Sequence, residues 1–299
     1  MRHAPLILCA ITACSLVACS SESAQQDENN ANAIRVATST NVWSGIVEKL
    51  SDDPNVQVSS VIEAGAVDPH TFEPSAADMA KLKEADVVVV GGGGYDAWAY
   101  QGIDHDKVVA ALPIDAESEE SHDHDHHDHH DHHHGDVNEH VWFDIHAVQH
   151  LAEHVTEKLQ QAGANTNEAE FMDQLEQAHQ KIHDLPKLKV AQTEPIADYL
   201  LETAGMDERT PKGYREATLE ENEPSASDVA AFLEVIKNKD IDVLIYNPQT
   251  ETDMTKQLRK AAEEQNIPVV EIRETPPEGQ DYLSFLNQAI NDLASVQKR

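Results

Sequence analysis

Cysteine is scarce in this 299-residue chain and is confined to its first segment. The three cysteines are Cys9, Cys14 and Cys19, so nothing after residue 19 can form a disulfide bond. The rest of the chain must therefore be stabilised by packing. Any metal site there must draw on nitrogen and oxygen ligands.

Basic residues are also few, because 21 Lys and Arg stand against 55 Asp and Glu, which gives a formal charge of −34. A surface this acidic repels nucleic acid and attracts cations, which excludes nucleic acid as a partner. The same acidity also keeps an exported protein soluble, so charge alone assigns no cation-binding role.

Long hydrophobic runs are absent after the start of the chain, where no segment has the roughly 18 apolar residues that a membrane helix needs. At the start, Arg2 precedes a mostly apolar stretch from Leu6 to Ala18, which is typical of a secretion signal. The tetrapeptide ending in Cys19, Leu-Val-Ala-Cys, resembles the bacterial lipobox, and ordinary cleavage nearby is the alternative. We expect a signal peptide over 1–19, lipidation of Cys19, a flexible tether over 20–33, and an extracytoplasmic protein anchored to the cell membrane.

Short β-branched runs alternate with helical patterns along the rest of the chain. Between two such series, apolar residues recur at three- and four-residue steps over 167–186, which predicts one helix ended by Pro186. The pattern predicts an α/β fold with two Rossmann-like lobes and parallel-rich sheets, at 34–165 and 187–299, joined by a single long linker helix at 166–186. The expected strands are 34–38, 56–62, 86–90, 188–193, 241–246 and 267–272.

A histidine-rich run, residues 122–134, holds nine histidines and four aspartates. So polar a run cannot fold around its own core, and neutral imidazoles bind zinc, copper and nickel. We expect a mobile, auxiliary metal-collecting loop over 119–136; an engineered tag and a pH-responsive loop are the alternatives. Its histidines are His122, His124, His126, His127, His129, His130, His132, His133 and His134.

A tight metal site needs ligands held by rigid elements, and four residues beside expected strands are candidates. His70 lies in DPHTFEP and His140 in NEHVWFD, while Glu194 and Glu274 follow expected strands at the edge where open α/β sheets bind ligands. Taken singly, the histidines are explained as surface or hydrogen-bonded side chains. Glu194, before Pro195, is explained as a carboxylate at a helix N-terminus, and Glu274 as a loop charge.

Three further histidines, His146, His150 and His154, share one face of the helix expected from His146 to about residue 161. A solvated face and a surface metal site are both consistent with this spacing.

In their order along the chain, several segments resemble the solute-binding lipoproteins of bacterial zinc and manganese ABC importers. These segments are DPHTFEP, the histidine-rich run, EHVWFD, the linker helix, TEPIADYL, EPSASD and IPVVEIRE. The resemblance covers the chain from Ile34 onward. It implies two lobes bridged by one long helix, with a metal held in the cleft by His70, His140, Glu194 and Glu274. GGGGYDAW resembles the family's loop near the cleft, so Asp96 and Trp98 are candidate supports of those ligands.

The choice of metal depends on Glu194, which stands where many zinc members of that family have a histidine and manganese members a glutamate. Two imidazoles with two carboxylates can close a four-coordinate zinc site or reach higher coordination around manganese. The imidazole-rich run favours zinc. We therefore expect Zn²⁺ as the transported ligand, with Mn²⁺ as the alternative.

The resulting expectation is a monomeric receptor, not an enzyme, that delivers the ion to the membrane permease and ATPase of an ABC importer. A metal-dependent hydrolase and an extracellular metal buffer or adhesin are the competing functions. Neither H-E-x-x-H nor G-x-S-x-G occurs in the chain to favour the hydrolase.

Overall fold

Strands and helices alternate along the computed structural model, which describes residues 33–63, 69–114 and 137–297. In the first half, every strand pair is parallel, and the sheet has the order β2-β1-β3-β4. The elements of this half are β1 (Ile34–Thr40), α2 (Asn41–Leu50), β2 (Val56–Ile62), η1 (Pro69–Thr71), α3 (Ala76–Glu84), β3 (Val87–Val90), α4 (Ala97–Tyr100), η2 (His105–Lys107), β4 (Val108–Ala110), η3 (Val141–Phe143) and α5 (Ile145–Gln161).

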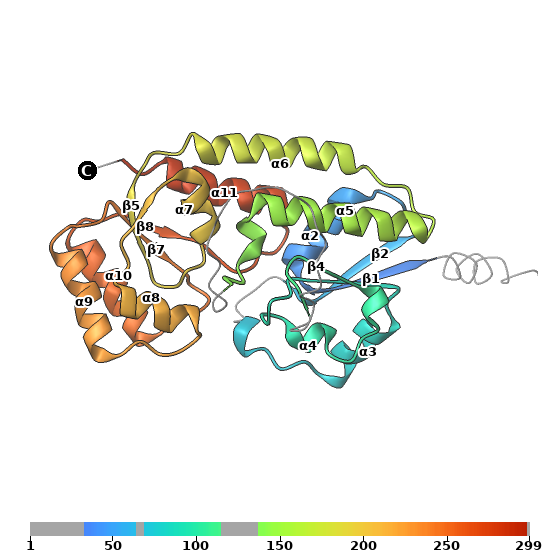
Figure 1. Ribbon diagram of the computed structural model, residues 1–299, viewed down its shortest axis with the longest axis horizontal. Coiled ribbons are helices and arrows are strands. Elements are labelled where there is room, and N and C mark those ends of the chain that lie inside the picture. Colours follow the sequence, from blue (N-terminus) through green and yellow to red (C-terminus); the bar gives the residue numbers. More distant parts are fainter. Residues whose placement is uncertain (1–32, 64–68, 115–136, 298–299) are drawn as a thin grey trace, which may run out of the picture. The chain divides into compact units, whose positions relative to one another are not determined.

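The second half repeats this arrangement with a parallel sheet of order β6-β5-β7-β8 (Figure 1). In both sheets the first strand lies between the second and the third, so a crevice opens at the carboxyl ends of these central strands. The elements are α6 (Glu168–His183), β5 (Lys189–Gln192), α7 (Asp198–Ala204), β6 (Asp207–Glu208), α8 (Lys212–Leu219), α9 (Ala226–Lys237), β7 (Val243–Tyr246), α10 (Asp253–Glu264), β8 (Val269–Glu271) and α11 (Tyr282–Ala294).

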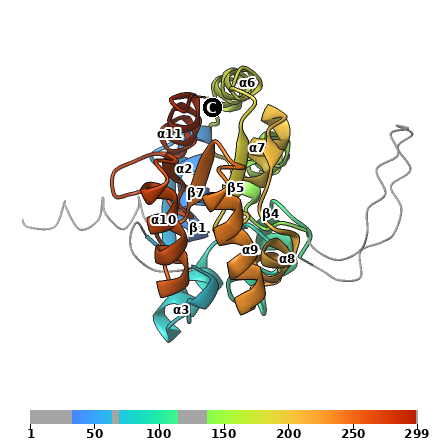
Figure 2. The same cartoon turned by 90° about the vertical axis from the view of Figure 1, so that its left-hand side faces the viewer.

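The predicted fold class is confirmed: two α/β lobes with parallel sheets are joined by one long helix, α6. The helix buries Phe171, Leu175, Ala178 and Ile182 at the expected three- and four-residue steps, and it ends before Pro186. Figures 1 and 2 show α6 lying beside α11, against which it packs. The boundaries 34–165, 166–186 and 187–299 stay predictions.

The C-terminal helix α11 also packs on the first lobe. The Tyr282 hydroxyl donates a hydrogen bond to the Trp142 carbonyl (2.8 Å), and the ring of Phe285 stacks on that of Phe143 at a centroid distance of 5.6 Å. A Cβ on Gly45 of α2 would lie 3.0 Å from the Tyr282 nitrogen. One continuous apolar core therefore runs beneath both sheets and joins the two lobes.

Three of the predicted features lie outside the described residues: the signal peptide over 1–19 with Cys19, the tether over 20–33 except for its last residue, and the histidine-rich run. Within the described part of the chain, no helix combines the length and the apolar character needed to cross a membrane.

Candidate metal centre

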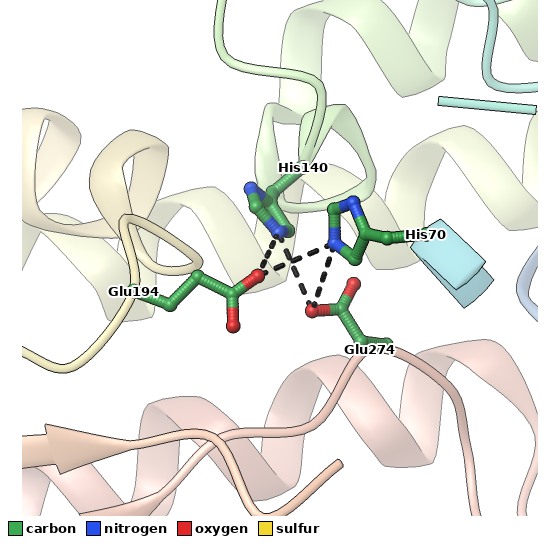
Figure 3. A group of neighbouring side chains, drawn as sticks. All are labelled: His70, His140, Glu194 and Glu274. Atoms are coloured by element: carbon green, nitrogen blue, oxygen red, sulfur yellow. Dashed lines mark hydrogen bonds and ion pairs between the residues drawn. The ribbon is translucent and has the colours of Figure 1, made fainter. Parts of the chain in front are cut away.

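The two histidines of the site lie in, or directly before, short 3-10 turns of the first lobe. His70 lies in η1, after β2, and His140 immediately precedes η3, which leads into α5. His140 is buried, and the side chain of His70 is only 12% exposed. Both rings point toward the same place between the lobes (Figure 3).

The two carboxylates come from strand ends of the second lobe. Glu194 lies two residues after β5, and Glu274 three residues after β8. The helix whose first turn we expected at Pro195 begins three residues later, as α7 at Asp198, and before it the Ala197 N–H donates to the Gln192 side chain (2.9 Å). Glu194 is therefore not a carboxylate of a helix's first turn, and its position in an extended turn lets its side chain reach the crevice.

These four side chains converge, with one ligand atom from each lying within 4.8 Å of the other three. The Nε2 atom of His140 lies 3.1 Å from Oε1 of Glu194 and 3.4 Å from Oε1 of Glu274. For Nε2 of His70 the same two distances are 3.3 and 3.7 Å. Ligands about 2.1 Å from a tetrahedral zinc ion lie roughly 3.4 Å apart, so this donor set fits a divalent cation.

Hydrogen bonds fix which nitrogen each histidine offers to the centre. Nδ1 of His140 donates to the Asn138 side-chain oxygen (2.7 Å), and Nδ1 of His70 lies 3.1 Å from a Glu139 carboxylate oxygen. With the proton held on Nδ1, each neutral imidazole directs the lone pair of Nε2 at the site. Asn138 also donates to the Pro195 carbonyl (2.5 Å), which ties the His140 segment to the turn that carries Glu194.

The carboxylates are held in place by polar side chains of both lobes. The Asn247 amide donates to Glu194 Oε2 (2.9 Å) and to Glu274 Oε1 (2.6 Å), and Thr250 also donates to Glu194. The Tyr95 hydroxyl donates to Glu274 Oε2 (3.2 Å). Because these donors are rigidly packed, the carboxylate oxygens are positioned before any cation binds.

The charges of the four side chains are strongly coupled. Burial alone would lower the pKa of His140, but the Glu274 and Glu194 carboxylates outweigh burial and raise it to about 10. Burial opposes ionisation of Glu194, but hydrogen bonds from His140 and His70 hold the pKa of Glu194 well below its ordinary value. Protonated imidazoles thus balance the carboxylates, and a divalent cation that replaces their protons would do the same.

The cluster borders a cavity of about 660 Å³ between the lobes, lined by residues of both. Glu139 and Glu221 stand beside His70, with a Glu221 oxygen 3.4 Å from its Nδ1. The chain therefore surrounds the entrance to the cluster with carboxylates, which attract cations.

Among the described contacts, none joins Asp96 or Trp98 directly to the four side chains of the cluster. The buried Asp96 carboxylate accepts hydrogen bonds from the backbone N–H groups of Gly91 (2.7 Å) and Gly92 (2.9 Å) and so shapes the glycine loop that carries Tyr95. The Trp98 ring packs on Phe72, two residues after His70.

Several supporting residues were not expected from the sequence: Tyr95, Asn138, Glu139, Glu221, Asn247 and Thr250. Asn247 directly follows β7, so the rule that ligands bind at strand ends would have found it. Glu221 and Thr250 come from distant loops and have no such local signal.

Comparisons with known proteins identify the family. A family model described as zinc-uptake complex component A, periplasmic (ZnuA), matches residues 36–296. The zinc-binding lipoprotein AdcA of Streptococcus pneumoniae (strain R6) is 25% identical over 283 residues, covering 88% of this chain and 54% of AdcA. The chain thus spans about half the length of that relative.

Two further relatives match over nearly their whole length. The manganese ABC transporter substrate-binding lipoprotein PsaA of Streptococcus anginosus is 20% identical over 311 residues, 97% of this chain and 96% of PsaA. The structure of the periplasmic zinc-binding protein TroA from Treponema pallidum superposes with a TM-score of 0.63 at 17% identity, covering 89% of this chain and all of TroA's. The chain belongs to the zinc-uptake complex component A (ZnuA) family of metal-binding, solute-binding proteins.

Proposed function

We propose that this protein is an extracytoplasmic zinc receptor that binds one Zn²⁺ through His70, His140, Glu194 and Glu274 and delivers it to an ABC permease. The observation that carries this proposal is the convergence of two imidazole nitrogens and two carboxylate oxygens, drawn from both lobes, at separations that suit one divalent ion.

Zinc is favoured over manganese by the chemistry of the donors. Imidazole is a good ligand for zinc, whereas carboxylate, carbonyl and water oxygens suit manganese. The two Nε2 atoms are held in the ligand tautomer by their Nδ1 partners, and nine further imidazoles stand in the histidine-rich run. Manganese is the second candidate, because Glu194 supplies a carboxylate that could bind through both oxygens.

To deliver a cation to the permease, the protein must first bind it between the lobes and then release it. The ligands come from separate lobes, so a conformation that moves the lobes apart separates His70 and His140 from Glu194 and Glu274. We infer that the permease and its ATPase favour that conformation, and that lipid on Cys19 keeps the receptor at the membrane. Asn138 and Glu139, which line the cavity, follow the histidine-rich run closely in the sequence, and we infer that the run supplies zinc to the cluster.

The test is the stoichiometry and affinity of tightly bound zinc, measured against a chromophoric chelator that strips weak sites. We expect one tight Zn²⁺ per chain, and a loss of more than 100-fold in affinity in His70→Ala and in Glu274→Gln. His150→Ala, which changes an exposed histidine outside the cluster, should leave the tight site unchanged. Tight binding that survives both cluster substitutions would refute the proposal.

A further inference from the structure

A second group of histidines lies on helices α5 and α6, on residues other than those of the cleft. The ring of His146, at the start of α5, meets that of His179 on α6 at a centroid distance of 5.2 Å. His179 in turn meets His183, one helical turn further along α6, at 4.6 Å. The histidine row expected on α5 is therefore divided, because His146 contacts α6.

The geometry points to a second transition-metal site, formed by the imidazoles of His146, His179 and His183, that takes a borderline divalent cation such as Zn²⁺, Cu²⁺ or Ni²⁺. Two imidazoles bound about 2.1 Å from one tetrahedral ion have ring centroids roughly 5 Å apart, which is the spacing seen here. Histidines four apart on a helix share one face and can bind the same ion.

The backbone that presents these rings is firmly held. Helices α5 and α6 pack against each other through buried apolar side chains, among them Val148 and Leu151 on α5 and Leu175 and Ala178 on α6. His179 is half-buried between the other two histidines, whereas His146 and His183 are exposed and free to turn their rings. Within the described residues the three sets of ring nitrogens do not yet all lie within 4.8 Å of one another, so binding requires that rotation.

The surroundings suit a cation. Burial, followed by the nearby His183 and His146, lowers the pKa of His179, which leaves that imidazole neutral and able to bind metal at neutral pH. Nδ1 of His179 lies 3.9 Å from a Glu176 oxygen, so a carboxylate stands close to the three rings. Lys181, between the two α6 histidines, is turned toward α11, where its ammonium donates to Asn287 (2.7 Å). A bound ion would join the start of α5 to the end of the linker helix.

The test is modification of histidines by diethyl pyrocarbonate in the full chain, read residue by residue by mass spectrometry, with Zn²⁺ alone as the probe. This readout separates the three histidines from the cleft and from the histidine-rich run. Zinc should slow modification of His146 and His183 by tenfold or more over one concentration range. His150 and His154, which are exposed on the same helix, should keep their metal-free rates.

Two variants make the test decisive. In His179→Ala, zinc should no longer slow modification of His146 and His183. In His183→Ala, which removes an exposed side chain and leaves packing intact, His146 should likewise lose its protection. No protection in the native chain, equal protection of His150 and His154, or protection that persists in both variants would overturn the assignment.

Discussion

Apart from the two histidines of the cluster, Asn247 is the one side chain that hydrogen-bonds to both of its carboxylates among the described contacts. Its amide sets the distance between Glu194 and Glu274 and keeps one oxygen of each directed at the histidines. Together with the protonated histidines, these two hydrogen bonds from Asn247 offset the repulsion between two buried carboxylates before a cation arrives.

Replacing Asn247 with leucine, which has nearly the same shape and no donor, should weaken zinc binding about 10- to 100-fold. The measurement is a chelator competition titration. Glu251→Gln serves as the matched control, because Glu251 lines the same cavity but bonds to Tyr246 and Lys256. Equal affinities in Asn247→Leu and the native chain would show that Asn247 does not position the carboxylates.

The sequence predicted the four side chains that converge, but few of the residues that hydrogen-bond to them. His70, His140, Glu194 and Glu274 are prominent because each adjoins a strand or turn with a recognisable pattern. Their partners Glu139, Glu221 and Thr250 are ordinary polar residues in loops, and only the folded chain brings them to the site. The supporting role expected of Asp96 stays a prediction: its contacts shape the glycine loop that carries Tyr95, whose hydroxyl donates to Glu274.

At the scale of elements, the turn between α8 and α9 carries Glu221 in a left-handed conformation (φ 56°) that non-glycine residues seldom adopt. This conformation directs its carboxylate across the cavity to His70, 3.4 Å away. The contact joins the second lobe to a histidine of the first and lowers the pKa of Glu221.

Glu221→Asn keeps a residue that tolerates the left-handed backbone and removes the reach of the carboxylate. We expect zinc affinity to fall about three- to tenfold, less than for a buried partner, because Glu221 is more than half exposed. Glu223→Gln, in the same turn, should change affinity by less than twofold. A calorimetric titration that gave identical affinities for Glu221→Asn and the native chain would contradict this role.

The contact of α2 with α11 predicts a separate effect on stability. A side chain at Gly45 meets the Tyr282 backbone, which cannot move without shifting α11. Gly45→Leu should therefore lower the free energy of unfolding by about 1–3 kcal/mol, measured by urea denaturation of the metal-free protein. Glu48→Ala, on the exposed face of α2, should change it by no more than about 0.5 kcal/mol. An unchanged midpoint for Gly45→Leu would mean that this packing is loose.

The strand pattern predicted six strands whose ends differ from the structure by no more than two residues. It missed β4 and β6, because three- and two-residue strands carry no periodicity of their own and exist only by pairing with β3 and β5. It also placed Pro195 in the first turn of a helix, whereas α7 begins at Asp198 and the Ala197 N–H before it donates to the Gln192 side chain.

At the scale of the whole molecule, two equivalent sheets turn the carboxyl ends of their central strands toward one crevice, and a continuous core beneath them holds it. This explains how residues more than 200 positions apart in the chain, His70 and Glu274, come within 3.7 Å of each other. The alternation of strands and helices predicts the sheets, whereas the packing of α11 on the first lobe has no local signal.

We expect the histidine-rich run to collect zinc and the cluster of His70, His140, Glu194 and Glu274 to bind it tightly. Deleting residues 122–134 should leave one tight zinc ion per chain but slow zinc capture at low metal concentration, as followed by stopped-flow chelator exchange. Loss of the tight ion on deletion would show that the run itself supplies ligands.

We propose that the cleft itself selects zinc. The most direct test offers Zn²⁺ and Mn²⁺ together, at equilibrium, to the chain lacking residues 122–134 and measures the metal bound per chain by mass spectrometry. We predict one tightly held zinc and no manganese once a chelator has removed metal from weaker sites such as His146, His179 and His183, and we expect that zinc to be lost in Glu194→Ala. One manganese retained in the presence of zinc would contradict it and would assign the choice of ion to the carboxylates of Glu194 and Glu274.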